Sequence, residues 1–113
     1  MKVIDIYQQY FSAEAEVNGI ERRAVSVILQ CESDEGDILY RAIVNFFPYE
    51  DPEDWRITSD ALTERTLYQA KGRRSRKREA QLEGQLRETA DELAAQLNGK
   101  IDWEHPLREA RRG

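Results

Sequence analysis

The chain has 113 residues, of which 40% are hydrophobic and 35% charged, and its formal net charge is −5 at pH 7. This length suits one compact domain with a single core, so we expect residues 1–113 to form one domain. The single cysteine excludes an internal disulfide, and no apolar stretch approaches the roughly 20 residues that a membrane-spanning helix needs.

The N-terminal segment has two readings. Asp5 interrupts its apolar start, which argues against a secretory signal and favours a cytoplasmic location. Residues 10–17 are predicted to form a strand. The residues before them also fit a short amphipathic helix, because apolar side chains recur at i, i+3, i+4, i+7 and i+8: Val3, Ile6, Tyr7, Tyr10 and Phe11.

A β-hairpin is predicted around Asn18-Gly19, because this dipeptide accepts the positive φ of both central positions in a type I′ turn. After the turn, apolar residues occupy every second position, and a period of two is typical of a strand with one buried face. These residues are Val25, Val27, Leu29 and Cys31. Cys31 is accordingly expected to be a small buried side chain and not a reactive thiol.

Three further strands are predicted before the helix. The first covers residues 38–47, which are rich in β-branched and aromatic side chains, and Pro48 ends it because proline cannot donate a ladder hydrogen bond. Two shorter strands are expected at residues 55–58 and 66–70. A helical turn over residues 60–65 is the alternative for the segment between them.

The clearest element is a helix over about residues 75–98. Its apolar residues recur at spacings of three and four, the pattern of one helical face: Leu82, Leu86, Ala90, Leu93 and Leu97. Asn98-Gly99 suits the left-handed conformation that closes a helix. After it, Ile101 is expected to fold back towards Leu93 or Ala94.

The order of elements predicts an α+β fold, in which an antiparallel meander of four or five strands packs on one long C-terminal helix. The strand-rich part covers residues 1–70, a basic junction covers residues 71–78, and the helix follows it. In the tail, residues 100–113, Trp103 and Leu107 are expected to dock against the domain before the chain frays.

The basic junction is the most unusual feature, because six of its eight residues are cationic in an acidic protein: Lys71, Arg73, Arg74, Arg76, Lys77 and Arg78. Cations repel the positive end of the helix dipole, so helix stability gives no reason for them. One reading is that carboxylates of the same assembly neutralise them, and this reading is slightly favoured. The other is that they bind a polyanion such as nucleic acid, helped by the helix N-terminus.

A second candidate is the stretch of residues 46–55, which contains four aromatic side chains and four carboxylates. A solvated structural loop is favoured there, and a protein-binding surface is the alternative. The candidate protein-binding residues are Tyr49, Glu50, Asp51, Glu53, Asp54 and Trp55. The carboxylate spacing does not match a calcium loop, so no metal is expected.

The function predicted from these patterns is that of a small non-enzymatic interaction module, acting as a homodimer or as an accessory or inhibitor of a larger partner. A nucleic-acid or polyanion binder is the alternative, and a small-ligand binder or enzyme is least favoured. The one histidine, His105, has no evident nucleophile or orienting carboxylate, so no catalytic residue and no cofactor are expected. The place of residues 71–78 relative to residues 50–54 would separate these readings.

Overall fold

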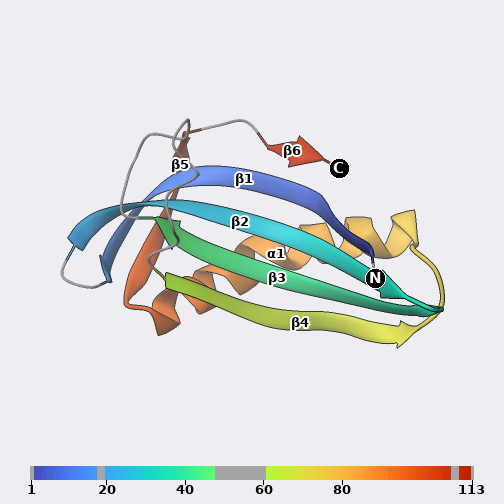
Figure 1. Cartoon of the computed structure of the whole chain (residues 1–113). Coiled ribbons are helices and arrows are strands. Elements are labelled where there is room, and N and C mark those ends of the chain that lie inside the picture. Colours follow the sequence, from blue (N-terminus) through green and yellow to red (C-terminus); the bar gives the residue numbers. More distant parts are fainter. Residues whose placement is uncertain (1, 18–19, 48–60, 108–109, 113) are drawn as a thin grey trace.

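The computed structural model describes residues 2–17, 20–47, 61–107 and 110–112. Its elements follow in this order: β1 (Lys2–Val17), β2 (Ile20–Asp34), β3 (Asp37–Phe47), β4 (Ala61–Lys71), α1 (Arg76–Gln96), β5 (Gly99–Pro106) and β6 (Arg111–Arg112). The strands form one antiparallel sheet in the order β4-β3-β2-β1-β5, and β6 also pairs with β1. The helix α1 lies across one face of this sheet (Figure 1), which confirms the expected α+β fold.

The strand β1 is long and continuous, so the helical alternative for the opening residues is wrong. Its register against β2 shifts between Asp5 and Tyr7, where one extra residue interrupts the alternation. Because of this shift, Ile4 and Tyr7 stand opposite Cys31 and Leu29, which both belong to the buried core. The residues that fitted the helical template therefore fall on both faces of the strand, since Phe11 stands opposite the buried Val25 whereas Val3 stands opposite Glu32 and is 52% exposed.

The structure describes the β2–β3 turn but not the two central residues of the β1–β2 turn. Asn18-Gly19, the predicted turn, lies outside the described residues, and the flanking Val17 and Ile20 are paired across β1 and β2. The β2–β3 turn is formed by Glu35 and Gly36, whose φ angles are 43° and 90°. Positive φ at both central positions is what a two-residue type I′ hairpin requires.

The predicted buried face of β2 is confirmed. Val25, Val27, Leu29 and Cys31 are each at most 1% exposed and face the helix side of the sheet. Burial raises the pKa of the Cys31 thiol, which is free, so the thiol stays protonated within the core.

The strand β4 is continuous over 11 residues and longer than the strand predicted at residues 66–70. The helical turn considered for residues 60–65 is therefore wrong over residues 61–65. β4 is an edge of the sheet, and Leu62 on it is 53% exposed. An edge strand with few buried side chains carries little apolar periodicity, which is why the pattern did not show its full length. The strand predicted at residues 55–58 lies outside the described residues.

The helix α1 begins after Ser75, whose hydroxyl accepts a hydrogen bond from the backbone N–H of Arg78 at 3.3 Å. Four of its five predicted apolar positions are buried against the sheet, and the fifth packs at the margin of the core. The buried four are Leu82, Leu86, Ala90 and Leu93, and the marginal one is Leu97. No helix in the described part of the chain combines the length and apolarity needed to cross a membrane.

The chain reverses sharply after α1. Asn98 has a φ of 58°, which confirms the left-handed closure expected at this position. The backbone N–H of Leu97 donates to the carbonyl oxygen of Ala94 at 2.9 Å. Ile101 then joins the same buried cluster as Leu93 and Ala94, as its spacing predicted.

Most of the expected tail is a strand, which corrects the prediction of a docked irregular segment. β5 pairs with β1 over Gly99–Asp102 and again at Pro106, and the three residues between them form a bulge. Trp103, in this bulge, packs edge-on against Phe11 with ring centroids 4.3 Å apart, so its predicted docking is confirmed. The N–H of Leu107 donates to the carbonyl oxygen of Tyr10 at 2.9 Å. β5 escaped prediction because it has only two core-facing apolar residues.

Candidate functional site

The basic junction connects β4 to α1 at the end of the sheet that also carries the β2–β3 turn (Figure 1). Gly72 has a φ of 136°, a conformation that side chains rarely allow, and its N–H donates to the carbonyl oxygen of Gly36 at 2.6 Å. Ser75 then caps the helix. The junction is therefore held at both ends by backbone and side-chain hydrogen bonds.

Arg74 of the junction belongs to a partly buried network, in which its own side chain is 40% exposed. Its guanidinium donates from Nη2 to Glu79 Oε1 at 2.8 Å and from Nε to Oε2 at 3.1 Å. The Tyr40 hydroxyl donates to the same Oε2 at 2.6 Å, and Glu79 is only 7% exposed. Such a bidentate pair with a further hydrogen bond satisfies a carboxylate that would otherwise be costly to bury.

The network shifts the pKa values of its members in the directions this geometry implies. Hydrogen bonds from Arg74 hold the pKa of the Glu79 carboxyl below its usual range, although burial acts in the opposite direction. Burial, and after it the hydrogen bond to Glu79, raises the pKa of the Tyr40 hydroxyl. Glu79 therefore stays ionised and Tyr40 stays neutral, so the charge of Arg74 is compensated within the chain.

Arg78 also has a partner inside the molecule, because its guanidinium carbon lies 3.8 Å from the centroid of the Tyr68 ring. The other four cations of the junction are exposed, and none forms an ion pair with a carboxylate in the described part of the chain. They are Lys71, Arg73, Arg76 and Lys77. The predicted six-residue surface is thus divided into two residues with structural contacts and four open to solvent.

One of the four open cations, Lys71, stands beside an acidic turn. Asp37 is the cross-strand partner of Lys71, and Gly36 of the same turn accepts the hydrogen bond from Gly72. Asp34 and Glu35 in this turn are also exposed. Three carboxylates near the junction lower its positive potential. The other predicted surface, Tyr49, Glu50, Asp51, Glu53, Asp54 and Trp55, lies outside the described residues.

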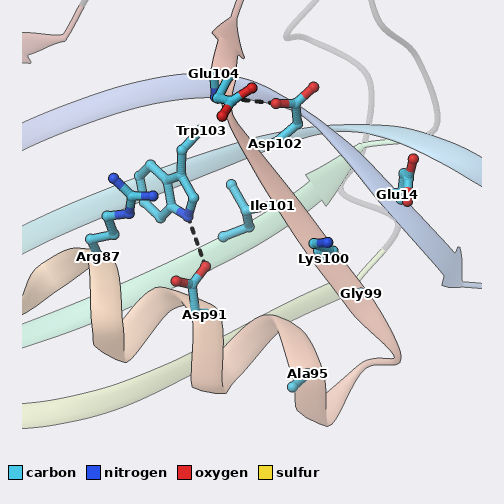
Figure 2. Close-up of a pocket in the computed structure, with 10 residues that line it drawn as sticks. All are labelled: Glu14, Arg87, Asp91, Ala95, Gly99, Lys100, Ile101, Asp102, Trp103 and Glu104. Atoms are coloured by element: carbon cyan, nitrogen blue, oxygen red, sulfur yellow. Dashed lines mark hydrogen bonds between the residues drawn. The ribbon is translucent and has the colours of Figure 1, made fainter.

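A groove of about 750 Å³ lies at the opposite end of α1, between the helix and β5 (Figure 2). One wall is the helix, which contributes Arg87, Asp91 and Ala95. The other is formed by six consecutive residues, 99–104. Successive side chains of a strand point to opposite faces, so a cavity that touches all six must run along the edge of β5 and not over one face. This edge is free of a second strand neighbour in the described sheet.

Trp103 shapes the end of the groove that is farther from the helix stop. Its indole Nε1–H donates to Asp91 Oδ1 at 2.7 Å, and the guanidinium carbon of Arg87 lies 5.2 Å from its ring centroid. Both partners come from α1, as Figure 2 shows. Ile101 and Ala95 line the groove beside it. The bulge in β5 thus directs the Trp103 side chain towards the helix. Bulges commonly redirect side chains in this way.

His105 has a carboxylate neighbour that the sequence pattern did not indicate. Its Nδ1 lies 2.8 Å from Asp102 Oδ2, and Asp102 Oδ1 accepts the N–H of Glu104 at 3.1 Å. The hydrogen bond to His105 lowers the pKa of Asp102. His105 is largely exposed, whereas catalytic pairs lie in clefts. The described residues contain no group of three His, Cys, Asp or Glu side chains placed to hold a metal ion.

No family model, curated protein or solved structure matches the chain. Its candidate sites are therefore identified by their own geometry, namely the basic junction at one end of α1 and the groove beside β5 at the other. Sequence patterns missed the groove because it needs the pairing of β5 with β1. The available signal was the alternation of Ile101 and Trp103 with charged residues directly after a helix stop.

Proposed function

We propose that the protein is a small, non-enzymatic, cytoplasmic interaction module that binds an extended segment of a partner protein along the free edge of β5. One observation carries this proposal: the groove follows the strand edge over residues 99–104 and has α1 as its second wall. An extended peptide can add to such an edge through main-chain hydrogen bonds, while pockets beside the edge receive alternate side chains.

The edge of β5 suits a partner better than the opposite edge of the sheet. β4 carries exposed charges at Glu64 and Lys71, and its register against β3 shifts around Leu67. Charges and bulges keep edge strands from pairing with other chains, but β5 also has exposed charges, at Lys100 and Glu104, and a bulge over residues 103–105, so these features do not separate the two edges. At β5 the wall formed by α1 adds side-chain contacts to the backbone ones, which supports binding of a specific segment.

Blocking the groove is expected to abolish peptide binding. The probe is an acetylated and amidated six-residue peptide of alternating Thr and Val, and its binding is followed through the backbone amide resonances of the labelled protein. Resonances of residues 87–104 should shift in the parent chain. They should not shift in Ala95→Trp, because Ala95 is an exposed lining residue and a large side chain there fills the groove.

The matched control is Ala80→Trp, which places the same side chain at an exposed position on the first half of α1, away from the groove. Binding to this variant should equal that of the parent. A peptide N-methylated at alternate residues should not bind, because it lacks the main-chain donors of an added strand. Shifts located along β4, or none at all, would contradict the proposal.

A polyanion-binding role is the second candidate, favoured by the four exposed cations of the junction. Replacing Arg73 and Arg76 by Gln is expected to reduce retention of single-stranded RNA at about 50 mM salt and to lower the salt-dependence slope by about 1.4, at about 0.7 for each phosphate contact. Filter binding over a salt series measures both quantities. The double variant Arg87→Gln, Lys100→Gln removes equal charge elsewhere, and an equal loss there would contradict a site at the junction.

A further inference from the structure

We infer that the segment bound in the β5 groove is cationic, with a lysine or arginine side chain seated at the Trp103 end. This inference rests on the proposed function, since it names the chemistry of the segment that the groove accepts. It follows from the charges around the groove, from their positions along it, and from the lone pairs that the internal hydrogen bonds leave open.

The groove has more carboxylates than cations. Among the described residues, four carboxylates line it, from Glu14, Asp91, Asp102 and Glu104, against the two cations of Arg87 and Lys100. Potentials in a concave site sum over its walls, so this excess favours a positively charged occupant. An anionic segment would meet like charges along the same path.

The excess is concentrated at one end. Glu14 and Lys100 are cross-strand partners on β1 and β5, so their opposite charges offset each other at the end near the helix stop. Asp91 on the helix and Glu104 on the strand lie nearer the other end, with the Trp103 ring between them in Figure 2, and Asp102 lies beside Glu104. A basic side chain of a bound strand is therefore stabilised beside Trp103.

Two of these carboxylates keep oxygen atoms open to a ligand. Asp102 already accepts from the N–H of Glu104 with one oxygen and contacts His105 with the other. Asp91 uses Oδ1 for the indole of Trp103, and its Oδ2 has no hydrogen-bond partner in the described part of the chain. The exposed side chain of Glu104 is likewise without one there. Asp91 and Glu104 both line the groove, and each has carboxylate oxygen that can accept a hydrogen bond from an ammonium or guanidinium.

Arg87 acts against the ligand in this arrangement. Its guanidinium lies over the Trp103 ring at 5.2 Å and is the one cation among the described lining residues at the acidic end of the groove. A bound lysine or arginine is repelled by it and competes with it for the aromatic face. Removing the charge of Arg87 should strengthen binding of a cationic segment, and removing the charge of Glu104 should weaken it.

The test compares two acetylated and amidated hexapeptides, one of alternating Val and Lys and its twin of alternating Val and Glu, at about 50 mM salt. The reporter is the indole N–H resonance of Trp103, one of two tryptophans in the chain, identified with Trp55→Phe. The lysine peptide should bind at least five times more tightly. Each substitution removes one exposed charge. Glu104→Gln should therefore weaken binding of the lysine peptide about threefold, and Arg87→Gln should strengthen it about threefold.

Glu88→Gln is the matched control, because Glu88 is exposed on the same helix and does not line the groove. It should leave both affinities unchanged. Equal affinity of the two peptides, or tighter binding of the glutamate peptide, would overturn the charge inference while strand binding stood. If neither peptide moved the Trp103 resonance at millimolar concentration, strand binding itself would fail along with it.

Discussion

Replacing Leu93 by Ala is expected to lower the free energy of unfolding by about 3 kcal/mol, within the range measured for buried leucines. Leu93 is 1% exposed and lies in the part of α1 that packs over the sheet, in one cluster with Ala94 and Ile101. Truncation removes the buried methyl groups and leaves a cavity that the rigid sheet cannot close. Urea unfolding followed by circular dichroism measures the change.

The control for this substitution is Leu62→Ala, the same chemical change on an exposed side chain of β4. It should alter the free energy of unfolding by less than about 0.5 kcal/mol, as surface substitutions usually do. Equal destabilisation by both variants would mean that α1 is not anchored through Leu93. Because α1 is one wall of the groove, Leu93→Ala should also weaken binding of the peptide at β5.

Replacing Glu79 by Ala is expected to cost about 2 to 3 kcal/mol of stability, as loss of a charged hydrogen-bond partner typically does. The substitution leaves the buried Tyr40 hydroxyl without its acceptor and releases Arg74 into solvent. Tyr40→Phe combined with Glu79→Ala should cost less than the sum of the two single changes. Without the Tyr40 hydroxyl, removing Glu79 leaves no buried donor unpaired there. Glu88→Ala, exposed on the same helix, should be nearly neutral.

The same network predicts how stability depends on pH. The folded-state pKa of Glu79 is lowered, so its contribution is fully present above the unfolded-state pKa near 4.5 and is lost as the pH falls through the lower folded value. The pKa of Tyr40 is raised, so its contribution is present below the unfolded-state value of 10 and declines above it. Glu79→Ala should therefore flatten the acid limb of a stability profile. An unchanged limb would contradict the partly buried ion pair.

The sequence predicted the parts of the fold that bury a regular stripe. The alternation of Val25, Val27, Leu29 and Cys31 and the stripe along α1 both mark faces that lie in the core. Prediction failed where a bulge or an edge strand interrupts the regular spacing of buried apolar residues. The apolar residues at the start of β1 are spread over both of its faces and interrupted by a bulge between Asp5 and Tyr7, and β4 and β5, the two edges, have too few buried residues to mark their length.

The candidate sites show a similar limit. The sequence presented the junction as six equivalent cations, and the structure separates them because two meet partners that no spacing rule relates to them. Tyr40 and Tyr68 come from strands β3 and β4 and reach the start of α1 only in the folded chain. The groove was invisible for the same reason, since its two walls become neighbours of the sheet edge only when β5 pairs with β1.

The pairing of β5 with β1 joins residues that are far apart in the chain, such as Ala13 and Ile101. Closing so long a loop is slow, and contacts of this kind tend to form late in folding. During synthesis the first four strands and most of α1 leave the ribosome before β5 does. The groove therefore forms only after residues 99–104 have been synthesised and β5 has paired with β1.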